Sequence, residues 1–388
     1  MLPSSASHCA ALALGACILL AAHARGQVLS VAARGSIELP GVAIDQHGDT
    51  FTITGLSGIT YGGAAQDAHS FFAVMDNSDK LVELMVRFTA DGSIESATVV
   101  RGVTLAETRD FEGIALADAG TAVLSEEGTP GIRAYNLADG APAETWTTPP
   151  VFAARRANFG FESLCRLGNT VWTANEEALS VDGPLSTPSS GTVVRLLRYD
   201  AGAPAAQFAY ATAPIHGLII SGSRSGLSDL VALPDGRLLA LERSFALASP
   251  LFLTRLYEVD MSSATDVSAL PGLAGQTYTP ATKRLLYSGG HNNLEGLCLG
   301  PRLANGTHAL LGIVDDADPV STNRLVAFEL SGLPDPCPAD WDSSGDVASP
   351  DFFAFLTDFF GGDADFNSDG VTDSRDFFDF LTRFFAGC

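Results

Sequence analysis

The stretch Asp110-Phe111-Glu112-Gly113-Ile114 decides the fold, because a phrase of the same form recurs along the chain. The related phrases are GLSGI at 55–59, GFESL at 160–164, GLSDL at 226–230 and NLEGL at 293–297. Their third residues stand at positions 57, 112, 162, 228 and 295, so the steps are 55, 50, 66 and 67 residues. An apolar segment that ends in acidic residues follows each phrase. Repeats of this length and composition predict a β-propeller, whose blades are four-stranded sheets around a channel.

The sequence around these phrases is strand-like from about Val28 to Leu330. Short runs rich in Val, Leu, Ile, Phe and Thr alternate with Gly, Asp-Gly and Pro turns. The segment LVALPDGRLLALE at 230–242 predicts an antiparallel hairpin with Pro-Asp-Gly at its tip. We therefore expect an all-β fold over residues 27–335, a five- or six-bladed β-propeller. The phrases mark five blades, and we suspect a sixth, unmarked one.

Acidic residues recur where the blades of a propeller line the channel. The recurring acids of the phrases are Glu112, Glu162, Asp229 and Glu295, and the strands that follow end in Glu126, Glu176, Glu242 and Asp315. Like charges gathered on an axis repel one another and raise each other's pKa values unless a cation neutralises them. A divalent cation there also polarises a carbonyl or phosphoryl oxygen or activates water. We expect a catalytic site with calcium on the axis; the open alternative is that the acids accept backbone N–H bonds and lock blade to blade.

Two further residues are candidates for this site. Arg243 stands at a strand end, and its planar guanidinium suits a phosphate or a departing oxyanion, with a salt bridge to Glu242 as the alternative. His291, in SGGHNNLEG at 288–296, is the candidate base, with a surface-loop histidine as the alternative. Ser57 and Ser228 lack the Gly-x-Ser-x-Gly elbow, so a serine nucleophile is not expected.

The end of the chain contains a tandem repeat with an offset of 25 residues, beginning at Asp340 and Asp365. Each copy opens with a twelve-residue loop whose oxygen-bearing residues stand at the ligand places of an EF-hand. The predicted calcium ligands are Asp340, Asp342, Ser344, Asp346 and Asp351 in the first loop, and Asp365, Asn367, Asp369, the Val371 carbonyl, Asp373 and Asp376 in the second. Ala348 removes one ligand from the first loop, so the second site should fill first. A Phe-rich helix is expected after each loop.

Charge and the amino-terminal sequence indicate where the protein works. The formal net charge of −23 argues against nucleic acid and anionic membrane as partners. An apolar stretch over residues 9–22, followed by Ala22-His23-Ala24, predicts a signal peptide over residues 1–26, with lipidation at Cys17 as an alternative. No other stretch has the length of apolar sequence that spans a bilayer. We expect a secreted or cell-surface protein.

Four cysteines remain after the predicted signal peptide. Cys337 and Cys388 bracket the terminal repeat and are predicted to form a disulfide, as exported proteins permit. Cys165 and Cys298 lie in strand-like apolar runs, and either pairing or burial as free thiols is open.

Both parts of the chain resemble known families. The loop–helix repeat resembles dockerins, and CPAD at 337–340 with FFAGC at 384–388 is similar to the GC-type dockerin tails of exported planctomycete-like bacterial proteins. This resemblance implies that residues 336–388 anchor or sort the protein through a cohesin-like or cell-surface partner.

The main domain resembles the phytase-like, "esterase-like activity of phytase" family through DFEGIAL, NFGFESL, GLSDLVALPDGRLLALERSF and NLEGLCLGPRL. This resemblance implies an exported hydrolase that acts on a small phosphate or carboxylate ester. It places Glu112, Glu162, Asp229, Glu242, Arg243 and Glu295 in the recurrent segments of the family. The open alternative is a non-catalytic propeller that binds a polysaccharide or a protein partner.

Overall fold

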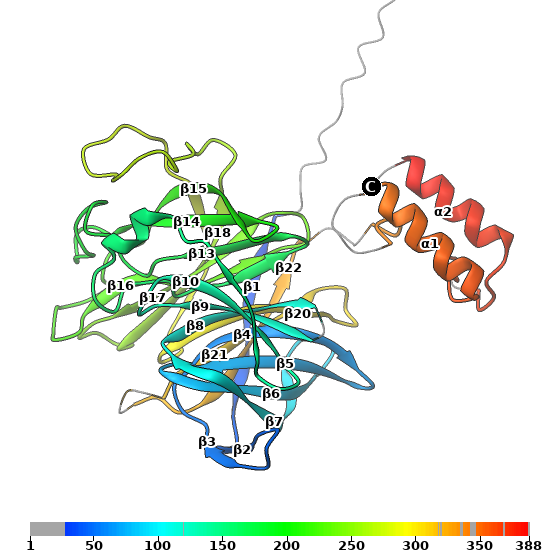
Figure 1. Cartoon of the computed structure of the whole chain (residues 1–388), viewed down its shortest axis with the longest axis horizontal. Coiled ribbons are helices and arrows are strands. Elements are labelled where there is room, and N and C mark those ends of the chain that lie inside the picture. The colour runs from blue at the N-terminus through cyan, green and yellow to red at the C-terminus, as the bar shows by residue number, and fades with distance from the viewer. Residues whose placement is uncertain are drawn as a thin grey trace, which may run out of the picture.

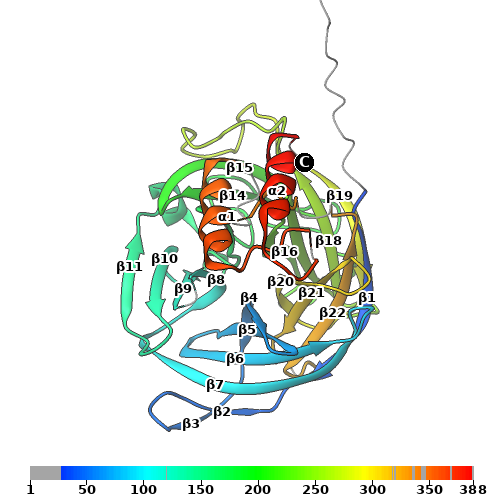
Figure 2. The same cartoon turned by 90° about the vertical axis from the view of Figure 1, so that its right-hand side faces the viewer.

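The computed structural model describes residues 28–118, 120–316, 318, 320–333, 337–341, 347–367 and 369–386. The predicted signal peptide, the predicted ligands Asp342, Ser344 and Asp346, and Cys388 lie outside the described residues. A pair of helices stands apart from the β-sheets (Figure 1), and five four-stranded antiparallel sheets are arranged in a ring (Figure 2).

Each sheet is one blade, and its strands follow one another from the channel outward. The first blade contains β4 (Leu56–Ala65), β5 (Ala68–Met75), β6 (Ser78–Phe88) and β7 (Ile94–Arg109). The second contains β8 (Phe111–Asp118), β9 (Thr121–Glu126), β10 (Gly131–Asn136) and β11 (Pro142–Trp146). The third contains β12 (Cys165–Leu167), β13 (Thr170–Ala174), β14 (Val193–Asp200) and β15 (Ala203–Ala211). The fourth contains β16 (Arg224–Ala232), β17 (Leu238–Phe245), β18 (Phe252–Asp260) and β19 (Thr282–Gly289). The short 3₁₀ helix η1 (Pro150–Ala154) precedes the third blade.

The fifth blade closes the ring with strands from both ends of the propeller. It contains β20 (Leu294–Arg302), β21 (His308–Val314), β22 (Arg324–Ser331) and, outermost, β1 (Ser30–Glu38). β1 pairs antiparallel with β22, from Ser30 opposite Ser331 to Glu38 opposite Arg324. The described residues therefore form five blades, and the suspected sixth is wrong. The remaining hairpin, β2 (Val42–Ile44) and β3 (Thr50–Thr52), lies beside β7.

Close approach of the innermost strands explains why the phrases recur. A Cβ atom on Gly58 would lie 2.3 Å from the carbonyl oxygen of Glu112 in the next blade. A Cβ atom on Gly296 would lie 2.5 Å from the carbonyl oxygen of Ser57. Side chains do not fit at this spacing, so glycine follows the third residue of the phrase in three of the five blades.

The hydrophobic core lies in layers between neighbouring blades. Phe71 and Val82 of the first blade pack in one cluster with Leu311, Ile313 and Leu325 of the fifth. Each of these residues is fully buried. Because every blade buries both faces against its neighbours, its strands are continuous apolar runs, which is the pattern that the sequence shows.

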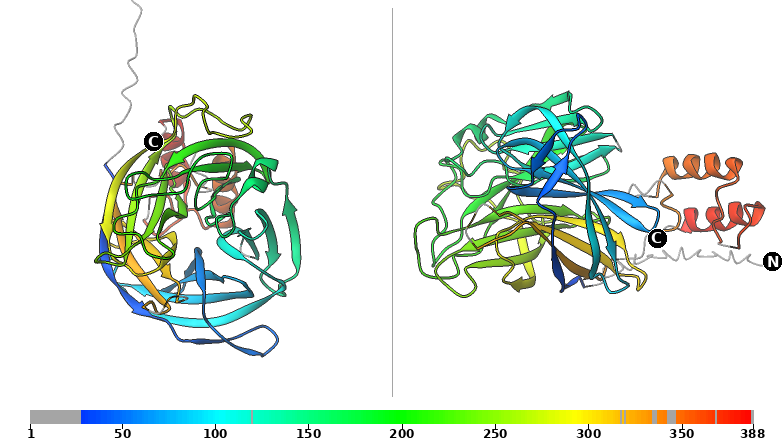
Figure 3. Two further views of the ribbon diagram at one scale, coloured as in Figure 1. Left: turned by 90° about the vertical axis from the view of Figure 1, so that its left-hand side faces the viewer. Right: turned by 90° about the horizontal axis from the view of Figure 1, so that it is seen from below.

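All innermost strands run in the same direction along the channel. Ser57 and Glu295, near the starts of β4 and β20, line a cavity at one end, whereas Tyr61 and Leu299 of the same strands line a cavity at the other. β22 runs antiparallel to β21, so it ends away from the first cavity. The chain therefore enters and leaves the propeller at the face opposite that cavity. Figure 2 shows this face with the helices in front, and the left view of Figure 3 shows the opposite face.

The two expected tail helices are present as α1 (Ser349–Gly361) and α2 (Ser374–Ala386). They pack through Phe355 and Phe380, whose rings stack 3.9 Å apart at an angle of 2°. Cys337 is disulfide-bonded, and its predicted partner Cys388 lies outside the described residues. Neither helix has the length and apolar composition that a membrane crossing requires.

Candidate active site

An acidic cavity of about 450 Å³ opens at the end of the channel where the innermost strands begin. The third residue of each phrase forms an inner ring of five equivalent positions: Ser57, Glu112, Glu162, Ser228 and Glu295. All but Ser228 line the cavity. The predicted site residues Glu112, Glu162 and Glu295, far apart in sequence, therefore meet in one place.

A second ring comes from the residue that faces the start of each phrase across the blade. The members of this ring are Asp76, Glu127, Glu176, Arg243 and Asp315, and all five line the cavity. The backbone hydrogen bonds show that these positions are equivalent. The N–H of Asp76 donates to the carbonyl of Gly55, the first residue of its phrase, and the N–H of Glu127 donates in the same way to the carbonyl of Asp110. Arg243 thus occupies the place that an acid has in the other four blades.

Two of the acids expected to face the channel do not face the cavity, because successive side chains of a strand point to opposite sides. Glu126 stands one residue before Glu127, so its side chain points away from the cavity and pairs with Arg109 and Arg133. Glu242 stands one residue before Arg243 and is fully buried, where it accepts a hydrogen bond from the Tyr210 hydroxyl at 2.6 Å. Lys283 also pairs with Glu242. The prediction that these two glutamates end in the acidic ring is wrong, because their neighbours hold those positions.

Eight acidic residues and two arginines are among the described residues that line the cavity, without any lysine or histidine. Arg243 pairs with Glu295 and, at 3.0 Å, with Glu176. Arg224 lies 3.5 Å from the same Glu176 oxygen. The two cations therefore neutralise the side of the cavity next to the fourth blade. The carboxylates of the first three blades exceed the positive charge that the described lining residues supply.

Burial and the neighbouring carboxylates raise the pKa values of four of these carboxyl groups. Burial and the neighbouring Asp110 raise the pKa of Asp76 to about 6. Burial and the nearby Glu176 raise the pKa of Glu127 to about 7. Burial, with other carboxylates close by, raises the pKa values of Glu112 and Glu162 well above the ordinary value. With a pKa of about 7, Glu127 is partly protonated near neutral pH unless a cation is bound beside it.

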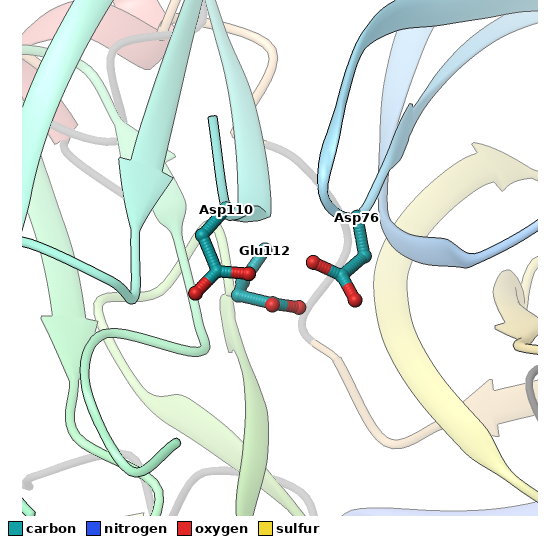
Figure 4. Close-up of side chains that lie close together, drawn as sticks. All are labelled: Asp76, Asp110 and Glu112. Carbon is teal, nitrogen blue, oxygen red and sulfur yellow. The ribbon is translucent and has the colours of Figure 1, made fainter. Parts of the chain in front are cut away.

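Two groups of three carboxylates have the spacing that one hard cation needs. Asp76 faces Asp110 and Glu112 across the gap between the first two blades (Figure 4). The second group consists of Glu127, Glu162 and Glu176. Within each group, one oxygen per residue lies within 4.8 Å of the others. Two oxygens bound to one calcium at about 2.4 Å can be at most about 4.8 Å apart, so both groups fit such an ion.

The Glu162 carboxylate lies among other carboxylates at the wall of the cavity. Only 9% of Glu162 is exposed, and the residue lines the cavity. Among the described residues, its carboxylate faces Glu127 and receives no hydrogen bond from a backbone N–H, a hydroxyl group or a cationic side chain. A buried carboxylate in this position is costly unless a proton or a cation completes it.

Asp229 and His291 are not among the described residues that line this cavity. Asp229 occupies the place of the phrase glycine, and its carboxylate accepts the backbone N–H groups of Leu297 at 2.7 Å, Leu230 at 2.8 Å and Leu164 at 3.4 Å. It therefore ties three blades together, as the alternative interpretation expected. His291 hydrogen-bonds the Tyr287 hydroxyl through Nε2 at 2.6 Å and packs on Phe328. The structure does not place either residue among those that line the acidic cavity.

Sequence reasoning missed Asp76, Asp110 and Glu127. Asp110 opens a phrase, and Asp76 and Glu127 directly follow the second strands, so a signal was present in the sequence. Choosing Glu127 over Glu126 required the pairing register of the strands. The cavity also has an apolar wall of Phe245, Leu251, Phe252 and Val320 that no repeat predicted.

Cys165 and Cys298 are both free and buried. They line the cavity at the opposite end of the channel. Burial raises the pKa values of both thiols well above the ordinary value, so neither is a reactive thiolate near neutral pH.

The fold and the site together define a five-bladed propeller with an acidic cavity at one mouth of its channel. The chain belongs to the Phytase-like family: the family model described as "Esterase-like activity of phytase" matches residues 52–317. No curated protein matches the sequence.

Several solved structures are distantly similar to this chain. The α-L-arabinofuranosidase from Lactobacillus brevis has a TM-score of 0.44 and 8% identity, covering 71% of this chain and 91% of that one. The endo-arabinase from Bacteroides thetaiotaomicron has a TM-score of 0.43 and 11% identity, covering 72% and 97%. The glutaminyl cyclase from Myxococcus xanthus has a TM-score of 0.37 and 13% identity, covering 76% and 96%. Similarity this distant does not bear on activity.

The second tail loop has a compact turn. Both carboxylate oxygens of Asp365 accept backbone N–H groups, from Asp369 at 3.0 Å and Gly370 at 2.7 Å. Gly370 has φ of +89°, the left-handed conformation that glycine tolerates best. Asp376 accepts the N–H groups of Asn367 at 3.0 Å and Asp373 at 2.8 Å. The predicted ligand residues of this loop therefore lie around one turn. Of the first loop, Asp340 and Asp351 are among the described residues.

Proposed function

We propose that this protein is a metal-dependent hydrolase of phosphate or carboxylate esters. The observation that carries the proposal is the excess of buried carboxylates at one mouth of the channel, in two groups spaced for a cation. Asp76, Asp110 and Glu112 would hold one ion, and Glu127, Glu162 and Glu176 a second. Calcium is the proposed ion, because carboxylate oxygens are its preferred protein ligands.

A bound divalent cation would supply positive charge that polarises a carbonyl or phosphoryl oxygen and makes water more acidic. The remaining steps belong to the protein. The oxygen of a water molecule attacks the carbonyl carbon or phosphorus, and the bond to the alkoxide oxygen breaks. A carboxylate of the inner ring takes one proton of that water and delivers it to the departing alkoxide.

Arg243 is proposed to stabilise the negative charge that develops on the reacting oxygens. Only 3% of Arg243 is exposed, and its guanidinium is fixed by Glu176, Glu295 and Asn293. A cation held in advance by such contacts needs no reorganisation during the reaction. The same contacts fix Glu176 and Glu295 at the wall of the cavity.

The test uses the full chain and short p-nitrophenyl esters and phosphates. Chelation should abolish hydrolysis, and added calcium should restore it. Glu162→Gln should lower kcat by at least about a hundredfold, within the range for losing a general base or an electrostatic partner. Glu144→Gln, an exposed glutamate on β11, is the matched control and should retain full activity. If hydrolysis survives both chelation and Glu162→Gln, the metal-dependent mechanism fails. If no ester is hydrolysed with calcium present, a propeller that only binds its ligand becomes the better explanation.

We further propose that the tail is a calcium-binding, dockerin-like module on an exported protein. The ligand residues of the second loop around one turn support this, as does the duplicated helix. Each helix exposes two phenylalanines seven residues apart, Phe353 with Phe360 and Phe378 with Phe385, which would suit a cohesin-like or cell-surface partner. Because the tail leaves from the face opposite the acidic cavity, such anchoring would keep the cavity open. Asp365→Ala with Asp376→Ala should abolish calcium binding by the second loop, measured by calorimetry.

A further inference from the structure

The acidic cavity has an apolar wall that metal-dependent hydrolysis alone does not require. The rings of Phe245 and Phe252 lie 4.9 Å apart at an angle of 36°, at the ends of β17 and β18. Leu251 and Val320 continue the wall toward solvent, with 36% and 51% of each residue exposed. The cavity is therefore amphipathic: carboxylates from the first three blades face aromatic and aliphatic side chains from the fourth blade and the loop before β22.

The apolar wall continues outward onto a rim made by two loops of the fourth blade, residues 215–223 and 246–251. The exposed apolar residues of these loops are Leu218, Ile219, Ile220, Leu247 and Leu251. The Leu247 N–H bonds the Leu218 carbonyl at 3.0 Å, and the Ala246 N–H bonds the Leu251 carbonyl at 3.1 Å. These bonds tie the two loops to each other and to Leu251, the residue that belongs to both the rim and the wall.

His216 fixes the rim in place. Its Nδ1 lies 2.8 Å from the Ser244 hydroxyl, and its Nε2 lies 2.9 Å from the Pro250 carbonyl oxygen. The apolar surface is therefore preformed, which lowers the entropy cost of binding a ligand there.

The charges of the cavity disfavour a compact polyanion. Arg224 and Arg243 are the cations among the described lining residues, and both pair with Glu176. Even with two divalent cations bound, the formal negative charge of the eight acidic lining residues exceeds the positive charge of the ions and the two arginines, so a substrate with many phosphates would add to that excess. A substrate with one ester and an apolar group adds little charge and covers the exposed apolar wall.

We propose that the substrate is an amphiphilic ester, with a carbon chain or ring seated against Phe245, Leu251, Phe252 and Val320. This inference rests on the proposed function and specifies the substrate class of the same site. The ester group of the substrate faces the carboxylates, and its carbon chain extends along the rim. Hydrolysis adds the hydroxyl of water to carbon or phosphorus and its remaining hydrogen to the alkoxide, giving one acid and one alcohol. The apolar group belongs to either the acyl or the alcohol part.

Binding of butyl-, hexyl- and octylphosphonate to the calcium-loaded full chain tests the subsite without turnover. Affinity measured by calorimetry should rise about two- to fourfold for each added methylene, the gain for burying part or all of a CH₂ group. Leu251→Ser and Val320→Ser, both at partly exposed positions, should weaken this dependence. Leu285→Ser, at a leucine on the outermost strand β19 that is as exposed as Val320, is the control and should preserve it.

Hydrolysis of p-nitrophenyl acetate, butyrate and octanoate, and of inositol hexakisphosphate, completes the test. Chain-length-dependent phosphonate affinity that Leu251→Ser removes supports the subsite, even if no ester is hydrolysed and the proposed function fails. Equal affinity for all three phosphonates overturns the inference. Faster turnover of the hexakisphosphate than of every alkyl ester also overturns the inference about the substrate, but it supports the proposed hydrolase function. A preference for octanoate places the chain in the acyl part; phosphonate binding without that preference assigns it to the alcohol part.

Discussion

Removing calcium should make the stability of the propeller fall as the pH rises from 5 to 8. In the metal-free protein the pKa of Glu127 is raised from 4.5 to about 7. A carboxyl group with a raised folded-state pKa stabilises the fold fully below its unfolded pKa, and that contribution disappears as the pH rises through the folded value. The shift of roughly 2.5 units corresponds to about 3 kcal/mol of unfolding free energy lost by pH 8. Asp76, with a pKa raised to about 6, acts in the same direction.

Urea unfolding at pH 5 and pH 8, with chelator and with calcium, measures this effect through tryptophan fluorescence. Calcium should offset the loss at pH 8 and have a smaller effect at pH 5, where Glu127 and Asp76 are already protonated. Glu127→Gln should reduce the pH dependence of the chelated protein by about 3 kcal/mol, whereas Glu144→Gln should leave it unchanged. A calcium effect of equal size at both pH values in the wild-type protein and in Glu127→Gln would refute the reasoning.

Three other substitutions test separate parts of the account. Asp229→Ala should lower the free energy of unfolding by about 3 kcal/mol or more in urea titrations, because it leaves buried backbone N–H groups without an acceptor; a loss below about 1 kcal/mol would contradict its role in tying the blades. Gly113→Ala should destabilise by about 1–3 kcal/mol, because the added Cβ would lie 2.4 Å from the Leu164 nitrogen, while Gly41→Ala, with no atom within 4 Å, serves as its control. Arg243→Lys should lower kcat in ester hydrolysis at least tenfold, because a compact ammonium group does not reproduce the planar fork whose two terminal nitrogens reach Asn293 and Glu295 on one side and Glu176 on the other; unchanged kcat would remove Arg243 from the site.

The architecture was predictable from the sequence because its cause is local. Five innermost strands must pass close to one axis, and this requirement leaves a glycine after the third residue of most phrases. The phrases therefore mark the blades directly. The number of blades was less certain, because the outermost strand of the fifth blade comes from the other end of the chain.

The composition of the site was only partly predictable. Glu112, Glu162 and Glu295 belong to the phrases and were found. The choice between Glu126 and Glu127, or Glu242 and Arg243, depends on which residue of a consecutive pair faces the axis, and one residue of register reverses that answer. Asp229 carries the same functional group as the site acids, yet it bonds backbone N–H groups because it stands at the glycine place, nearer its neighbours.

Crystals grown with manganese as a calcium substitute would test the central claim most directly, because anomalous scattering locates the ion without an assay. The account predicts peaks between Asp76, Asp110 and Glu112 and between Glu127, Glu162 and Glu176. Glu162→Gln should remove the second peak and keep any peak in the tail loops. Ions bound by the tail loops alone, with none in the acidic cavity at neutral pH, would contradict the account.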